Sequence, residues 1–328
     1  MIYRLLNDAD LQGLMVLWNH YALLENHQYK KMNLEEIKSH FYESQETYQL
    51  ITFVGIENDR LVGFSSGVYE NHQNKAFLTY ILVDIEYRRK HIASDLLKLL
   101  EANFKQYNQL ENIDINFFNP IKLKWTIPNK TLCEHPNAPG VDMKNVGYAF
   151  MQSLGYIAYA YQNAYYRDLA NFIYRDDIKI LMKEINEKGI HISIFNSGKH
   201  FGFDELFDDL KSNAWRKEIS NNLKKINGGD PIIIVEENGK ICGFTGPLSV
   251  EKSKRGYFAG IGISSHYRGL GLGKILFANL CTELKQIGAE YMTLFTGENN
   301  PARKIYESEG FVIVRSWANM RKLIKRSD

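Results

Sequence analysis

Several features that mark particular classes of protein are scarce in this chain. It has only three cysteines in 328 residues, Cys133, Cys242 and Cys281, and their wide spacing predicts neither a disulfide framework nor a metal site. No apolar run approaches the length of a membrane span, and the N-terminus lacks the charged and apolar regions of a signal peptide. We therefore expect a cytoplasmic protein that uses no metal and binds no membrane.

The chain also lacks a strong charge of either sign. Its 40 Lys and Arg residues against 38 Asp and Glu residues give a formal net charge of +2. The short basic runs Lys30-Lys31 and Lys224-Lys225 are not interleaved with stacking aromatics. We therefore expect no nucleic-acid partner. The length and a hydrophobic fraction of 45% suit two globular domains of ordinary size.

What the chain does contain is a cluster of three glycines between a strand pattern and a helix pattern. Residues 257–263 predict a buried strand, and 275–286 carry apolar residues at helical spacing. Between them runs Arg268-Gly269-Leu270-Gly271-Leu272-Gly273-Lys274. Glycines at the start of a helix let a phosphate approach the exposed backbone N–H groups at the positive end of the helix dipole. The segment therefore predicts a pyrophosphate-binding loop, although glycines also occur at helix starts for packing reasons.

The spacing separates this loop from two common nucleotide-binding motifs. The dinucleotide fingerprint requires G-x-G-x-x-G, and the Walker loop requires four residues between its first glycine and G-K-[ST]. Neither spacing is present. The residues instead form R-x-x-G-x-G at Arg268, Gly271 and Gly273. Here the chain resembles the GCN5-related N-acetyltransferase (GNAT) family, whose corresponding loop holds the pyrophosphate of acetyl-coenzyme A.

A second motif lies downstream of a short strand pattern at 291–295. It resembles the second signature of the same family, N-x-x-A-x-x-x-Y-x-x-x-G-F, at Asn299, Ala302, Tyr306, Gly310 and Phe311. Pro301 suits the first turn of a helix and Gly310 suits its exit, so a helix is predicted at 301–309. An ordinary amphipathic helix with a core tyrosine is the alternative interpretation.

The resemblance implies a fold and a set of cofactor contacts. The fold is α/β with a mixed sheet (α+β), built as two tandem acyl-CoA N-acyltransferase domains of the GNAT type. The backbone at Ile261, Gly262 and Ile263 would bind the pantetheine arm, and Asn299 would add a hydrogen bond to the arm. The residues that would hold the pyrophosphate are Arg268, Gly269, Leu270, Gly271, Leu272, Gly273 and Lys274.

The implied reaction is direct transfer of an acetyl group from acetyl-coenzyme A to a primary amine on a small molecule or a peptide. Tyr306 is the candidate catalytic residue, because a phenol with a pKa of about 10 stays protonated at neutral pH and can donate to a departing thiolate. A non-catalytic acetyl-coenzyme A sensor is the alternative function. No general base is evident, and the candidates could equally be solvated side chains: Glu236, Glu237, Glu298 and His266.

The first half of the chain repeats this order of patterns. A strand pattern is followed by a turn and then by a helix pattern at about 89–107. Arg88, in the turn, aligns with Arg268. The two motif glycines are replaced there by His91 and Ala93. We therefore expect two copies of one fold.

The first copy lacks residues that the chemistry would need. Met151 takes the place of Tyr306 and has no proton to donate, and the His91 side chain would obstruct a phosphate. Tyr148, one turn earlier, could substitute only in a shifted helix. We therefore expect the first copy to have a structural or substrate-shaping role.

The two copies also differ in length. The first carries an insertion at 117–145 with four of the seven prolines of the chain, which suggests a surface excursion that is either a functional lid or an inert decoration. We expect a degenerate domain at 1–172 and an intact one at 173–328, in a monomer or a homodimer. The acceptor pocket would involve residues 201–223, whose aromatics could equally be core and whose acids could equally be an exposed face.

Overall fold

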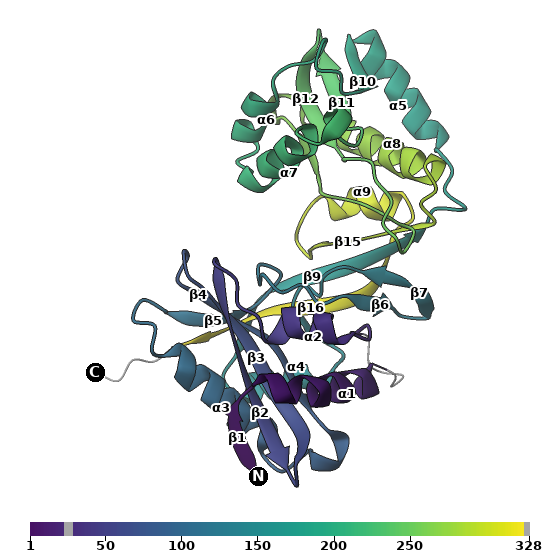
Figure 1. Cartoon of the computed structure of the whole chain (residues 1–328). Coiled ribbons are helices and arrows are strands. Elements are labelled where there is room, and N and C mark those ends of the chain that lie inside the picture. Colours follow the sequence, from purple (N-terminus) through teal and green to yellow (C-terminus); the bar gives the residue numbers. More distant parts are fainter. Residues whose placement is uncertain (23–28, 325–328) are drawn as a thin grey trace. The chain divides into compact units, whose positions relative to one another are not determined.

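The computed structural model describes residues 1–22 and 29–324 (Figure 1). The chain divides into two compact units, Met1–Asn163 with Arg315–Asp328, and Ala164–Val314. The C-terminal segment thus belongs to the first unit. The boundary expected near residue 172 rests on the sequence repeat, and it stays a prediction about where one copy gives way to the next.

The first unit is a mixed sheet with helices on both faces. Its strands are β1 (Ile2–Leu5), β2 (Tyr48–Glu57), β3 (Arg60–Glu70), β4 (Lys75–Val83), β5 (Asn112–Ile115), β9 (Ile157–Asp168) and β16 (Val312–Leu323). They lie in the order β1-β2-β3-β4-β5-β16-β9. One face is covered by α1 (Leu11–Tyr21) and α2 (Leu34–Phe41), the other by α3 (Ile92–Phe104) and α4 (Val146–Ser153).

The last strand of the chain lies inside the sheet of the first unit. β16 pairs antiparallel with β5, with Met320 opposite Ile115, and also pairs with the short β8 (Val141–Asp142). The side chains of Trp317, Ala318 and Met320 are completely buried. The first unit therefore takes part of its core from the far end of the sequence.

The insertion at 117–145 contributes to the core of the first unit. It forms a hairpin of β6 (Trp125–Ile127) and β7 (Lys130–His135). The Trp125 ring is fully buried and packs edge-on against Trp317, with ring centroids 5.3 Å apart. The expectation of a surface excursion is therefore wrong for this hairpin, whose tryptophan is a core residue.

The second unit repeats the element order of the first. Its elements are α5 (Asp176–Glu187), β10 (Ile190–Ile194), α6 (Phe203–Asp209), α7 (Asn213–Leu223), β11 (Ile233–Glu237), β12 (Lys240–Thr245), β13 (Arg255–Gly256), β14 (Ile261–Ile263), α8 (Leu272–Gln286), β15 (Tyr291–Gly297) and α9 (Arg303–Ser308). The order β1-α1-α2-β2-β3-β4-α3-β5-α4-β9 corresponds to β10-α6-α7-β11-β12-β14-α8-β15-α9-β16. This correspondence confirms two copies of one α/β fold.

A four-stranded antiparallel sheet, β10-β11-β12-β14, forms the centre of the second unit. Side chains alternate between its faces, so Ile233 and Val235 of β11 pack against α5 and α8, whereas Ile234 packs against α6 and α7. In the β11–β12 turn, Asn238 and Gly239 have φ angles of 52° and 82°, the positive values that a tight hairpin turn requires. None of the helices in the described residues has the length and apolar character needed to cross a membrane.

Candidate active site

Two neighbouring strands of the second unit diverge at the candidate site. Residues 255–256 (β13) pair in parallel with β15, but residues 261–263 (β14) pair antiparallel with β12. β14 is therefore an edge strand among the described residues. The predicted strand at 257–263 is wrong over 257–260, because the chain changes its pairing partner there and belongs to neither ladder.

The free edge of β14 offers backbone groups to a ligand. The Ser264 N–H donates to the Cys242 carbonyl of β12 at 2.8 Å. Because successive residues of a strand direct their N–H and C=O groups to opposite sides, Gly262 also faces β12, whereas Ile261 and Ile263 face away. An extended ligand can pair with such an edge as an added strand. Of the three residues predicted to bind the pantetheine arm, Ile261 and Ile263 thus present backbone groups at the open edge. The backbone groups of Gly262 are directed at β12.

The glycine-rich loop enters α8 in a left-handed conformation. Gly269 and Gly271 have φ angles of 85° and 75°, and Gly271 is the N-cap of α8 with no side chain capping the helix. The first N–H groups of α8 are therefore available, at the positive end of the helix dipole. Arg268 and Lys274 flank the loop; both are exposed, and neither forms an ion pair within residues 1–22 and 29–324. The loop has the charge and the donors that an anion requires.

The three loop glycines are needed for different reasons. A Cβ at Gly271 would lie 2.5 Å from Leu181 Cδ2, and one at Gly273 would lie 2.9 Å from Ile305 Cδ1. A Cβ at Gly269 would meet open space, so only its positive φ favours glycine there. At Gly271 and Gly273, tight packing against a neighbouring side chain therefore favours glycine, in addition to the close approach that a bound phosphate would need.

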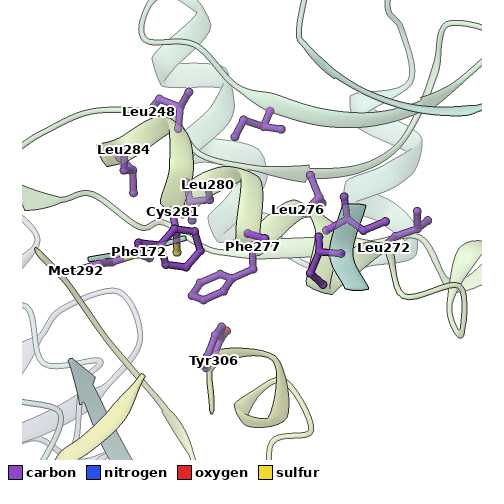
Figure 2. Packing of buried hydrophobic residues seen from close by; sticks show 14 of the residues in the cluster. Phe172, Leu248, Leu272, Leu276, Phe277, Leu280, Cys281, Leu284, Met292 and Tyr306 are labelled. Carbon is purple, nitrogen blue, oxygen red and sulfur yellow. The ribbon is translucent and has the colours of Figure 1, made fainter. Parts of the chain in front are cut away.

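Tyr306 lies in a cluster of aromatic rings beside the diverging strands. Figure 2 shows its ring approaching Phe277 of α8, and the two ring centroids are 4.8 Å apart. The rings of Phe258 and Tyr165 lie at 6.1 and 6.2 Å. Phe258 belongs to the segment that changes partner, so Tyr306 borders the point where β14 and β15 separate. The side chain is buried, and its hydroxyl has no hydrogen-bond partner in the part of the chain that the structure describes.

The surroundings of Tyr306 keep its proton in place. Burial raises the pKa of Tyr306 to about 12, and the neighbouring Tyr165 phenol adds to the rise. The hydroxyl is therefore a hydrogen-bond donor throughout the physiological range and not a base. This protonation state suits the predicted role of a general acid.

The turn that leads into α9 differs slightly from the prediction. α9 spans Arg303–Ser308, shorter at both ends than the predicted helix at 301–309. The Ala302 N–H donates to the Asn300 side-chain oxygen at 3.0 Å, which orders the entry to the helix. Asn299 is exposed in the same turn, two residues after the end of β15, so its side-chain amide is accessible to a ligand.

Two of the predicted base candidates are held by local hydrogen bonds. Glu237 accepts from the Tyr267 hydroxyl at 2.5 Å, and Glu236 accepts from the Gly239 N–H at 2.7 Å in the hairpin turn. Both carboxylates thus support local structure. In the part of the chain that the structure describes, no hydrogen bond holds the Glu298 carboxylate or the His266 ring. Glu298 is half-buried after β15, and His266 is exposed before the loop.

The acids of the predicted acceptor region are also held in place. Asp204 and Asp208 both pair with Arg216, the latter at 2.6 Å from Nη2. Asp209 accepts hydrogen bonds from the hydroxyl and the N–H of Ser265, which lower the pKa of its carboxyl to about 2. Asp204 and Asp208 are also exposed, as the interpretation of these acids as an exposed face expects.

A different pair of residues joins α7 to the segment before β14. The Trp215 indole N–H donates to the Ala259 carbonyl at 3.1 Å, and the Tyr257 hydroxyl donates to Glu218 Oε1 at 2.9 Å. Between these two bonded residues lies Phe258, which contacts the candidate acid. Sequence reasoning missed Glu218 and Tyr257, because their contact depends on the change of strand partner.

The first unit keeps the loop conformation without the glycines. Arg89 and His91 have φ angles of 63° and 62°, and His91 is the N-cap of α3. A side chain in the left-handed region costs roughly 1–2 kcal/mol, so the fold retains this geometry at an energetic cost. Arg88 donates its Nε–H to the Val83 carbonyl at 3.2 Å. Met151 is buried in the apolar core.

A buried carboxylate follows α9 directly. Glu309 is 4% exposed, and among the described residues neither of its carboxylate oxygens has a hydrogen-bond partner. The Arg175 guanidinium lies 3.7 Å from Oε1. Burial raises the pKa of Glu309, and the opposing attraction comes first from Arg175 and then from Lys274 and Arg167. The sequence alone did not mark this residue, because nothing local distinguishes a buried glutamate from a solvated one.

We expect the Glu309 charge to weaken the fold as the pH rises. Since its pKa is higher in the folded chain than the ordinary value of 4.5, its stabilising contribution is present in full below that value and is lost as the pH rises through the folded pKa. The difference in melting temperature between Glu309→Gln and the unchanged protein should therefore shift in favour of the variant from pH 4 to pH 7. Thermal melts at both pH values would measure it, and a constant difference would contradict the assignment.

Comparisons with known proteins match both units. The model of the family described as "Acetyltransferase (GNAT) family" matches residues 16–119 and 200–311. A curated relative, the [ribosomal protein bS18]-alanine N-acetyltransferase of Haemophilus influenzae, is 33% identical over 105 residues. The matched stretch is 32% of this chain and 62% of the relative, so the chain spans less than two thirds of the length of that protein.

Solved structures share the fold over almost the whole chain. The glucosamine N-acetyltransferase region of a fungal multi-domain GH3 β-N-acetylglucosaminidase gives a TM-score of 0.70 at 16% identity, over 98% of this chain and 38% of that one. A tandem GNAT protein from the clavulanic acid biosynthesis pathway gives 0.62 at 14% identity, over 100% and 99%. A GCN5-related N-acetyltransferase from Sphaerobacter thermophilus gives 0.59 at 13% identity, over 100% and 96%. At these identities the likeness concerns the fold.

Proposed function

The chain belongs to the GNAT acetyltransferase family, and from this premise we propose that its second unit transfers an acetyl group from acetyl-coenzyme A to a primary amine. The observation that carries the proposal is the meeting of three features in that unit. They are the free edge of β14, the uncapped glycine-rich entry to α8, and the protonated phenol of Tyr306 on α9. The first unit has Met151 in place of the phenol, so we assign it a structural or substrate-shaping role.

Acetyl-coenzyme A fits the chemistry of these groups. The pyrophosphate takes the N–H groups of residues 269–273 and the charges of Arg268 and Lys274, as anions do at helix N-termini. The amides of the pantetheine arm pair with the backbone of Ile261 and Ile263. The side chain of Asn299 adds a hydrogen bond to the arm.

Tyr306 acts as the general acid of this proposed reaction. A neutral amine attacks the thioester carbonyl carbon, and the new N–C bond forms with an oxyanion on the former carbonyl oxygen. The C–S bond then breaks as the carbonyl is restored. The Tyr306 hydroxyl gives its proton to the departing sulfur, and the proton lost from the nitrogen restores the phenol, directly or through water. A free N–H at the edge of β14 stabilises the oxyanion between the two steps.

The acceptor is a primary amine of a small molecule or a peptide. The names of two relatives support this class, since one acts on an alanine of a ribosomal protein and the other is a glucosamine N-acetyltransferase region. We propose the face of α7 that carries Glu218 as the acceptor side, because Tyr257 donates to Glu218 and the neighbouring Phe258 contacts Tyr306. We further propose that the protein works in the cytoplasm as a monomer or homodimer, without a nucleic-acid partner.

We expect Tyr306→Phe to bind acetyl-coenzyme A as the unchanged protein does, but to release thiol about 100-fold more slowly, because the phenyl ring keeps the packing and loses the proton. Calorimetry measures the binding. Thiol release is followed with glucosamine and with an alanine-initiated peptide as acceptors. The matched control is Tyr148→Phe, a tyrosine on the equivalent helix of the first unit, which should change neither quantity. Binding without turnover of any amine would favour the alternative, a non-catalytic sensor.

A further inference from the structure

The buried carboxylate after α9 has no counterpart in the first unit. The position aligned with Glu309 is occupied there by Leu154, which packs against the apolar core. A buried leucine stabilises the fold, because its apolar surface leaves water. A buried carboxylate destabilises the fold, because it loses its hydration. Only the unit that carries the phenol thus bears a charge at this position.

Arg175 holds the C-terminal end of α9. Its Nη1 donates to the carbonyl of Ser308, the last residue of the helix, and lies 3.7 Å from Glu309 Oε1. Its Nε and Nη2 donate to the two carboxylate oxygens of Asp177 at 2.9 and 2.6 Å. The guanidinium is therefore fixed between the start of α5 and the end of α9, where a cation also complements the helix dipole.

Arg167, from β9, lies against the residue that follows Glu309. A Cβ at Gly310 would be 3.2 Å from Arg167 Nη1 and 3.3 Å from Cζ, and Gly310 has a φ of 79°. Within residues 1–22 and 29–324, the buried Arg167 Nε–H has no hydrogen-bond partner. Two guanidinium groups therefore lie beside the exit turn of α9, which carries the buried carboxylate.

We infer that Glu309, Arg167 and Arg175 form a charge cluster that positions Tyr306. The N–H groups of Glu309 and Phe311 both donate to the Tyr306 carbonyl at 3.1 Å, so the exit turn is bonded to the backbone of the phenol residue itself. α9 has only 6 residues, too few for a helix to hold its shape without tertiary contacts. The three residues are positioning residues, because they reach the chemistry only through Tyr306.

The test compares the affinities of coenzyme A and desulfo-coenzyme A by calorimetry. The inference rests on the proposed function, in which the Tyr306 hydroxyl faces the sulfur of coenzyme A. One hydrogen bond to the sulfur should make coenzyme A bind about fivefold more tightly than its desulfo analogue, and Tyr306→Phe should abolish that preference. Arg175→Ala and Glu309→Leu should reduce the preference for coenzyme A toward the Tyr306→Phe value. They should leave the affinity for desulfo-coenzyme A unchanged. Arg175→Lys should restore part of the preference.

Two comparisons separate positioning from general damage. Glu309→Leu adopts the residue of the first unit, so its melting temperature at pH 7 should equal or exceed that of the unchanged protein. Lys304→Ala removes an exposed side chain of α9 that makes no hydrogen bond or ion pair in the described residues, and it should leave the preference intact. A normal preference in Arg175→Ala and Glu309→Leu would overturn the inference and leave the proposed function standing. If Tyr306→Phe keeps the preference, or coenzyme A does not bind, the proposed function fails.

Discussion

Replacing Gly271 by glutamate is expected to lower the affinity for acetyl-coenzyme A at least about 100-fold. Three effects act together at this N-cap of α8. The φ of 75° costs a side chain roughly 1–2 kcal/mol, and a Cβ would lie 2.5 Å from Leu181 Cδ2. A carboxylate there would also oppose the pyrophosphate at close range. Titration calorimetry of the purified variant measures the loss.

The first unit supplies a matched control for this result. His91→Glu places the same charge at the equivalent N-cap, where φ is 62° and a side chain is already present. We expect this variant to bind one equivalent of acetyl-coenzyme A with unchanged affinity. Gly271→Ala, which adds the methyl group alone, should fall between the two and divide the loss into strain and charge. Normal binding by Gly271→Glu would contradict the assignment of the loop at 268–274 as the site of acetyl-coenzyme A binding.

Ending the chain at Val314 should unfold the first unit. The strand that would be lost, β16, carries the buried side chains of Trp317 and Met320 into that unit and pairs with β5. Burying one large apolar side chain is worth about 1.5–3 kcal/mol. The sum of such losses approaches the whole stability of a domain, about 5–15 kcal/mol.

The truncation also leaves two buried acids without their arginine partners. Arg315 pairs with Asp142, and Arg321 makes two hydrogen bonds with Asp114 at 2.6 and 2.9 Å. Both carboxylates lie in the first unit with little exposure, whereas the Arg321 side chain is 44% exposed. The cost of about 3–5 kcal/mol for removing one partner of a buried pair therefore applies to Arg315 and Asp142. The loss of charge partners therefore adds to the loss of apolar burial.

Hydrogen exchange gives the readout for this prediction. In the chain that ends at residue 314, the amides of β2, β3 and β4 should exchange as in an unfolded chain. The control ends at residue 324 and retains all of β16, so it should show the protection of the full chain. Full protection of β2 to β4 in the shorter chain would show that the first unit folds without its C-terminal strand.

Local signals predicted much of this fold correctly. The helical pattern at 275–286 lies within α8, and the strand pattern at 291–295 lies within β15, because the apolar spacing of both segments agrees with their local structure. The two motif segments also lie together around α8, and the order of motifs along the chain was sufficient to predict two copies of one fold.

What the sequence could not predict depends on non-local pairing. An apolar run such as 257–263 indicates a strand but not its partner, so the change from β15 to β12 was missed. The same limit applies to β16, whose pattern does not state that it completes a sheet begun by residues 2–115. Trp125 of the insertion and Glu309 are buried by contacts with residues far away in the sequence. The local sequence around each of them indicates a surface position instead.

One measurement tests the central claim, that the second unit is the working copy and the first is not. Calorimetry gives the stoichiometry of acetyl-coenzyme A binding, and hydrogen exchange of the same complex locates the site. We expect one equivalent, with new protection at 261–263 and 268–274 and none at 88–93. Two equivalents, or protection at 88–93, would contradict the account and identify the first unit as a ligand-binding copy.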